Sequence, residues 1–148
     1  REHSGHMPTP TRGTRPLEPM MVLTTALEMS PHSVRQARNF FRSSADRLGV
    51  SAEDRDAGSL AVSEIVTNAI RYGAGPIELR TMLDHSSMRV EVSDRGAEMP
   101  VATTAEPDMS GGRGLGIIDA VAQAWGCDRH RDDDGKTVWF TLPRSVPL

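Results

Sequence analysis

The 148-residue sequence predicts a single α+β domain. The length suits one hydrophobic core, and aromatic residues make up only 4% of the chain, so the core must consist mainly of aliphatic side chains and methionine. Five segments alternate apolar and polar residues as strands do, whereas three place apolar residues at helical spacing. No internal repeat is visible, which favours one domain.

The first 19 residues differ in composition from the rest of the chain. Residues 1–19 are polar, rich in Pro, Thr and Gly, and without periodicity, which is typical of a disordered tail. Within them, residues 4–7 resemble the remnant of an expression tag. We therefore expect the folded domain to occupy residues 20–148.

The first strand is predicted at residues 21–27, and the first helix follows it. Ser30 and Pro31 are typical of a helix start, with Ser30 as the N-cap and Pro31 at the first helical position. Phe40 and Phe41 are adjacent, so one core-facing stripe cannot bury both. With Phe41 in the stripe, we expect Phe40 at its edge, partly exposed, where it either contacts a protein partner or covers a neighbouring element.

The second predicted helix, residues 53–72, carries a polar stripe on an otherwise apolar surface. Glu64 and Asn68 are four residues apart and lie one turn from each other, with Thr67 and Arg71 beside them. Asn is a poor residue inside a helix because its amide competes for backbone hydrogen bonds. An acid, an amide and a guanidinium in one line can hold a metal, a water and a phosphate. Taken alone, the same pattern is more typical of a solvated helix face.

Two strands come next, and the second ends in a carboxylate on its apolar face. Asp94 has the parity of Met88 and Val90, while Arg89 and Glu91 alternate with them as the polar face. A carboxylate on the apolar face is costly unless it is paired, which indicates a binding role. The Asp-Arg-Gly sequence that starts there is equally compatible with a simple hairpin turn.

A long loop and a glycine-rich helix start follow. Residues 97–111 form a loop that is long for a compact domain, and such loops are often lids or binding loops. Residues 111–116 read Gly-Gly-Arg-Gly-Leu-Gly and open a third helix, where glycines let backbone N–H groups approach an anion. A Rossmann or P-loop site is excluded, because no Gly-Lys-Ser/Thr occurs and no strand leads directly into the glycines. Two final strands are predicted near residues 124–129 and 137–142.

The composition excludes several classes of function. The net charge of −3 argues against generic binding to nucleic acid or anionic membranes. No apolar run approaches the roughly 18 residues of a membrane span, and no signal peptide is visible. The single cysteine, Cys127, permits no internal disulfide and fits a reducing compartment. We therefore expect a cytoplasmic protein without nucleic-acid or membrane partners.

Taken together, the motifs resemble the Bergerat ATP-binding fold shared by gyrase, heat-shock chaperones, sensor histidine kinases and mismatch-repair ATPases (the GHKL superfamily). They are a Glu-x-x-x-Asn helix, a strand ending in Asp-x-Gly, a glycine-rich helix start and a strand with Gly-x-Thr, in that order. The resemblance covers residues 21–143 and is closest to stand-alone bacterial anti-sigma-factor serine/threonine kinases of the actinomycete type. It implies a two-layer α/β sandwich with a mixed, mostly antiparallel sheet and helices on one face.

The resemblance also implies a role for each matching residue. Glu64 matches the general base that activates a water or a substrate hydroxyl, and Asn68 matches the ligand of Mg²⁺. Arg71 falls where a basic residue lies near the phosphates, and Asp94 matches the carboxylate that accepts a hydrogen bond from the adenine amine. The other ATP-binding residues implied are Gly96, Gly112, Arg113, Gly114, Leu115, Gly116 and Thr137.

Two positions depart from the family pattern and bear on ATP affinity. Glu98 replaces the usual second glycine of the Asp-x-Gly-x-Gly motif. Lys136 occupies the place of a threonine that gyrase-like members link to adenine through water, and Thr137 follows one residue later.

The chain has no room for the phosphoacceptor helices of a histidine kinase. The resemblance therefore implies an ATP- and Mg²⁺-dependent anti-sigma factor that phosphorylates a serine or threonine on a STAS-type anti-anti-sigma antagonist. Its expected partners are a sigma factor, that antagonist and a second copy of the chain, since such relatives are often homodimers. The alternatives are a nucleotide-binding module without catalysis or an ATPase domain excised from a larger regulator. The presence of both Glu64 and Asn68 favours catalysis.

Overall fold

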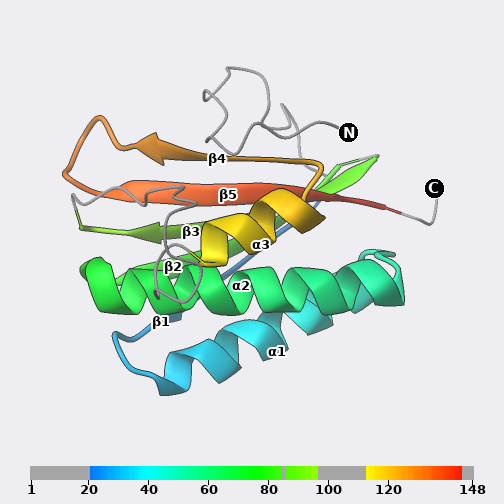
Figure 1. Cartoon of the computed structure of the whole chain (residues 1–148), viewed down its shortest axis with the longest axis horizontal. Coiled ribbons are helices and arrows are strands. Elements are labelled where there is room, and N and C mark those ends of the chain that lie inside the picture. Colours follow the sequence, from blue (N-terminus) through cyan, green and yellow to red (C-terminus); the bar gives the residue numbers. More distant parts are fainter. Residues whose placement is uncertain (1–20, 85, 97–112, 145–148) are drawn as a thin grey trace.

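The computed structural model describes residues 21–84, 86–96 and 113–144 (Figure 1). The tail predicted at residues 1–19 and the loop predicted at 97–111 lie outside these ranges, and both stay predictions. The elements follow one another as β1 (Met21–Leu27), α1 (His32–Arg47), α2 (Ala52–Tyr72), β2 (Ile77–Leu83), β3 (Ser87–Asp94), α3 (Arg113–Val121), β4 (Ala124–Arg129) and β5 (Lys136–Pro143).

The five described strands form one sheet in the order β1-β2-β3-β5-β4, with every pairing antiparallel. The described helices lie on one side of this sheet, and α2 runs between α1 and α3 and contacts both (Figure 1). The predicted α+β class and the two-layer sandwich are confirmed. Since β3 lies in the middle of the sheet, the end of β3 is flanked by β2 and β5.

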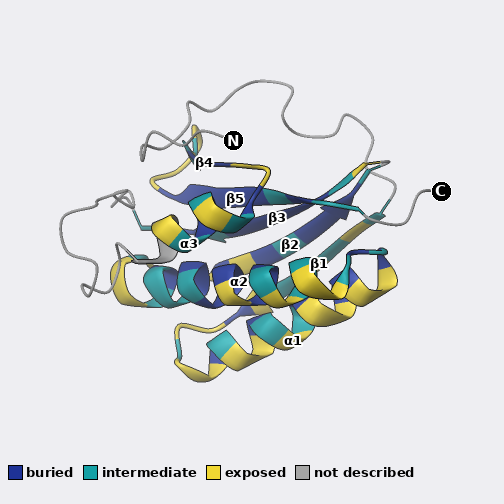
Figure 2. Cartoon of the chain, turned by 45° about the vertical axis from the view of Figure 1, so that its right-hand side comes forward, coloured by how far each residue is buried: buried dark blue, intermediate teal, exposed yellow. Residues whose placement is uncertain are grey.

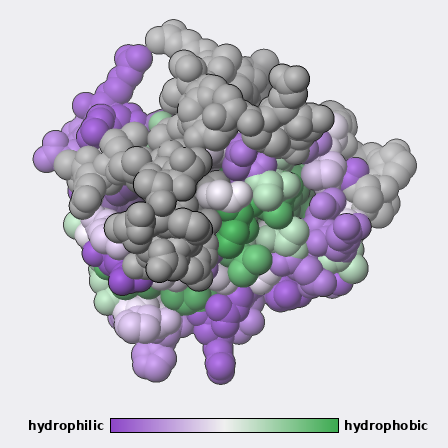
Figure 3. Space-filling model, in the orientation of Figure 1, coloured by the Kyte–Doolittle hydropathy of each residue, from purple (hydrophilic) through white to green (hydrophobic). Residues whose placement is uncertain are grey.

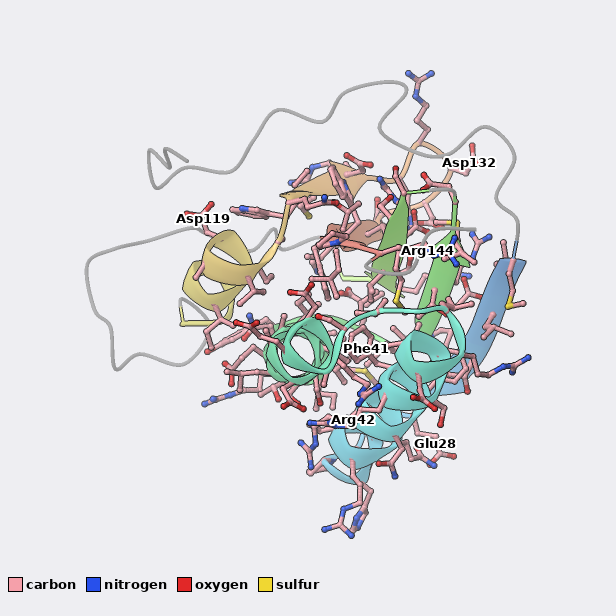
Figure 4. The ribbon with its side chains drawn as sticks, turned by 90° about the vertical axis from the view of Figure 1, so that its right-hand side faces the viewer. Glu28, Phe41, Arg42, Asp119, Asp132 and Arg144 are labelled. Atoms are coloured by element: carbon pink, nitrogen blue, oxygen red, sulfur yellow. The ribbon has the colours of Figure 1, made fainter. Side chains whose placement is uncertain are left out.

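The hydrophobic core fills the space between the helices and the sheet (Figure 2). Phe41 of α1 is fully buried and lies between α1 and α2 (Figure 4). Gly58 of α2 leaves room for that ring, because a Cβ at this position would collide with Phe41 and lie 2.8 Å from Leu142 Cδ1. Phe40 packs against the edge of the core and stays partly exposed, as predicted.

The helix starts differ from the predicted ones by one residue, a normal uncertainty for helix boundaries. Helix α1 begins at His32, with Pro31 in the N-cap position, and the Ser30 hydroxyl accepts the His32 N–H at 3.3 Å. Helix α2 is capped by Ser51, whose hydroxyl accepts the Asp54 N–H at 3.1 Å. None of the described helices combines the length and the apolarity needed to cross a membrane.

The sheet face away from the helices is less exposed than the alternating sequence predicted. Arg89 and Glu91 belong to this polar face of β3, yet each is only 2% exposed. The Arg89 Nε donates to Glu91 Oε2 at 2.9 Å, and its guanidinium lies 4.1 Å from the centroid of the Trp139 ring. This face therefore carries a buried, internally paired charge cluster.

Candidate functional site

The C-terminal end of α2 meets the end of β3. The Arg95 N–H donates to the Ala74 carbonyl at 2.7 Å. Gly96 and Gly73 allow this approach, because a Cβ on Gly96 would lie 2.7 Å from Gly73 Cα. Through this contact, the helix that carries the polar stripe ends beside Asp94. Asn68 lies five residues before Gly73, about 7.5 Å along the helix axis, and Glu64 lies one turn before Asn68.

Asp94 is buried at this junction, with 3% of its surface exposed. Its Oδ1 accepts hydrogen bonds from the Gly96 N–H at 2.6 Å, from Lys136 Nζ at 3.0 Å and from the Ala74 N–H at 3.4 Å. No described residue donates to Oδ2. Because β3 pairs with β2 on one side and β5 on the other, the Asp-Arg-Gly segment does not start a simple hairpin.

Lys136 is the partner that the buried carboxylate requires. It lies opposite Asp94 in the register of β5 with β3, and 6% of its side chain is exposed. Its Nζ also donates to the Gly96 carbonyl at 3.4 Å. A buried ammonium or carboxylate alone is costly, whereas the two together compensate each other. One feature of the sequence indicated a buried role for Lys136: this residue, the only lysine in the chain, has the strand parity of the apolar Val138 and Phe140.

The side chains of Thr137 and Asp94 lie on opposite faces of the sheet. Successive strand residues point to opposite faces, so the Thr137 side chain lies on the sheet face away from the helices. Its hydroxyl is 2.7 Å from the Ser93 hydroxyl and 2.8 Å from His130 Nε2. The placement of Thr137 in the nucleotide site, which the motif match implied, does not agree with this geometry.

The side chains of the α2 stripe are accessible. Glu64 is half-buried, and its carboxylate makes no hydrogen bond or ion pair with the described residues. Asn68 is also half-buried, one turn further along. Arg71 is exposed, and its guanidinium lies 5.8 Å from the centroid of the Tyr72 ring.

The glycine-rich segment is described only in part. Gly112 lies outside the described residues, as do the side chains of Arg113 and Leu115, although residues 113–115 belong to the backbone of α3. Gly116 is exposed, and a Cβ there would meet nothing within 4 Å. The described part of the first turn of α3 therefore borders open space.

These donors fit a nucleotide with a hard metal ion. Within residues 21–84, 86–96 and 113–144, no three His, Cys, Asp or Glu side chains are grouped as a metal cluster. Mg²⁺ commonly takes only one or two protein oxygens and completes its shell with water and substrate phosphates, which suits the Asn68 amide beside Glu64. The Oδ2 of Asp94, which receives no donor from the described residues, suits an amine such as that of adenine.

Residues 27–142 match the family model of the histidine kinase-like ATPase domain. The chain belongs to this family. The match begins at Leu27, the last residue of β1, and ends within β5. It includes Glu64, Asn68, Asp94 and the glycine-rich segment. This histidine kinase-like ATPase domain has no match among curated proteins.

A solved structure shares the fold of this domain. The domain is similar to a structure of the RsbU and RsbW domains of Rv1364c from Mycobacterium tuberculosis, with 23% identity and a TM-score of 0.65 over 88% of this chain. It spans about a third of that protein, 34% of its chain. A weaker likeness, with 10% identity and a TM-score of 0.49, covers 86% of this chain and 70% of the Acinetobacter baumannii histidine kinase AdeS. The mycobacterial match shows a shared fold and nothing beyond it.

Proposed function

We propose that this domain binds Mg-ATP and phosphorylates a serine or threonine hydroxyl of a protein antagonist, acting as an anti-sigma factor. The observation that carries the proposal is the accessible Glu64, unpaired among the described residues, on the helix that also presents Asn68 and ends against Asp94. A module that only binds nucleotide needs no available carboxylate at this place. The partner class, a sigma factor and a STAS-type antagonist, is the one that the family resemblance of the sequence motifs implies.

Each residue has a separate task in this reaction. Asp94 Oδ2 accepts a hydrogen bond from the adenine amine, Asn68 supplies an oxygen to Mg²⁺, and Arg71 balances phosphate charge. Glu64 accepts the proton of the attacking hydroxyl, whose oxygen bonds to the γ-phosphorus while the bond to the β–γ bridging oxygen breaks and ADP leaves. Mg²⁺ supplies charge neutralisation for the phosphates.

The surface beside the stripe supports a protein substrate. Figure 3 shows an apolar area among polar side chains on the face that carries α2 and α3. Leu60, one turn before Glu64 on α2, is 52% exposed, and Ile117 and Val121 of α3 are partly exposed. An apolar area of this kind often marks a protein contact, here next to the proposed base.

The test is transfer of radiolabelled γ-phosphate from ATP to candidate STAS-type proteins, with Glu64→Gln as the variant. Because a general base acts mainly in the transition state, Glu64→Gln should reduce transfer by at least about 100-fold while ATP affinity stays within about threefold. Arg131→Gln, an exposed change in the β4–β5 turn, serves as the control and should transfer normally. Equal loss of affinity and transfer in Glu64→Gln would give Glu64 a structural role. ATP binding without transfer to any antagonist would favour the non-catalytic module.

A further inference from the structure

We propose that Lys136 reads the nucleotide base: its ammonium donates a hydrogen bond to ring nitrogen N1 of adenine while Asp94 accepts the neighbouring amine. The inference rests on the proposed binding of ATP at this site. Gyrase-like members of the family have a threonine at the position of Lys136, and that threonine contacts adenine through a water. The proposal gives Lys136 a direct contact with adenine instead.

The first step is the hydrogen-bond capacity of the ammonium. Lys136 Nζ carries three N–H donors. Among the described residues it has two acceptors, Asp94 Oδ1 at 3.0 Å and the Gly96 carbonyl at 3.4 Å. One N–H therefore remains for a ligand, on a side chain that is only 6% exposed. An unused donor in such a place is costly, so a bound acceptor stabilises it.

The second step concerns the Oδ2 atom of Asp94, which is free to accept a hydrogen bond. All three donors that reach this carboxylate bind Oδ1, and no described residue donates to Oδ2. The ion pair thus presents one acceptor and one donor next to each other. Adenine offers the matching order on one edge, an amine donor at C6 followed by the acceptor N1. Lys136 can make this contact without leaving Asp94.

The third step is discrimination between purines. Guanine in the same pose would set its carbonyl O6 against the Asp94 carboxylate and its N1–H against the Lys136 ammonium. Both contacts would be repulsive, and a site whose buried polar groups are left unmatched rejects the wrong ligand strongly. The pair therefore selects adenine nucleotides, and Lys136 contributes half of that selection.

The decisive probe is 1-deaza-ATP, in which a C–H group replaces N1 and the amine is kept. Calorimetry on the wild-type full chain should show affinity for 1-deaza-ATP about 10- to 100-fold below that for ATP, the loss expected for one hydrogen bond to a charged donor. Lys136→Met should bind both nucleotides with similar, weakened affinity. Arg131→Met, which also removes one positive charge but from an exposed turn residue, should keep the wild-type ratio.

Several outcomes would overturn the inference. Equal affinity of the wild type for ATP and 1-deaza-ATP would do so without any substitution, which matters because Lys136→Met leaves Asp94 buried and unpaired. If Lys136→Met, or the charge-balanced Asp94→Asn/Lys136→Met variant, still bound ATP more tightly than 1-deaza-ATP, a group other than Lys136 would donate to N1. A failure of phosphoryl transfer would not change the ratio of the affinities for ATP and 1-deaza-ATP, so it would count only against the kinase function. Absence of any ATP binding would overturn both.

Discussion

Replacing Asp94 by Asn should reduce both the stability of the protein and its affinity for ATP. The substitution keeps the shape of the side chain and an oxygen for the Gly96 N–H, but it removes the counter-charge of Lys136. Since Asp94 and Lys136 are 3% and 6% exposed, water does not screen the Lys136 ammonium once it has lost its counter-charge. Breaking a buried ion pair costs about 3–5 kcal/mol, and the retained hydrogen bond favours the lower end, about 3 kcal/mol. For a domain of this size, that corresponds to a fall of about 10 °C in Tm.

The affinity should fall by about 1–3 kcal/mol, or about 5- to 150-fold in Kd, because an amide matches the adenine amine less well than a carboxylate does. Urea unfolding without nucleotide measures the stability, and calorimetry measures the affinity. Asp56→Asn is the matched control: its ion pair with Arg42 has the same 3.0 Å length but is 69% and 45% exposed, so the change should cost at most about 1 kcal/mol.

The double variant Asp94→Asn/Lys136→Met separates the two effects. With both charges removed, most of the lost stability should return, because a buried pair can be replaced by apolar groups at little cost. The ATP affinity should stay low. Equal stability of the single and double variants would refute the charge coupling, and wild-type ATP affinity in Asp94→Asn would refute the assignment of Asp94 to the base.

Four further predictions concern other residues. Asn68→Ala should lower ATP affinity about tenfold or more and remove its dependence on Mg²⁺ in calorimetric titrations; an unchanged Mg²⁺ dependence would place the metal elsewhere. Burial raises the pKa of the Cys127 thiol to about 12, so a thiol reagent should not modify native protein at pH 8 but should react after unfolding; rapid native labelling would contradict this. Phe40→Glu should reduce association with a second copy or a partner in light scattering without changing ATP affinity, and unaltered association would remove Phe40 from the interface. The Gly135 N–H and His130 hold the pKa of the Asp133 carboxyl below its ordinary value of 3.8, so its contribution to stability is present above pH 4 and is lost on acidification; Asp133→Asn should flatten the fall of Tm below that pH, and an identical profile would contradict it.

The sequence predicted the order and type of the described elements, because helical and strand periodicities are local properties. The parity of Asp94 with Met88 and Val90 correctly placed a carboxylate on the core side of β3. The identity of its partner could not be predicted in the same way. Asp94 and Lys136 are 42 residues apart, and their meeting depends on the register of β3 with β5, which periodicity within one strand does not contain.

Two other differences have equally specific causes. Thr137 was expected among the ATP-binding residues although it follows the family's threonine position, held by Lys136, by one residue. One step along a strand reverses the direction of the side chain, and the Thr137 hydroxyl pairs with Ser93 and His130 instead. Arg89 and Glu91 were predicted on the polar face from alternation. They are buried because they pair with each other and because the Arg89 guanidinium lies over Trp139, a tertiary arrangement that alternation alone cannot reveal.

The central claim is that the junction of α2 and β3 forms a site for Mg-ATP. Titration calorimetry of the wild-type chain with ATP, with and without millimolar Mg²⁺, tests it most directly. The geometry predicts saturable binding of one ATP per chain, strengthened by Mg²⁺ and weakened by Asp94→Asn. Absence of binding in millimolar Mg²⁺, or binding that neither Mg²⁺ nor Asp94→Asn affects, would contradict it.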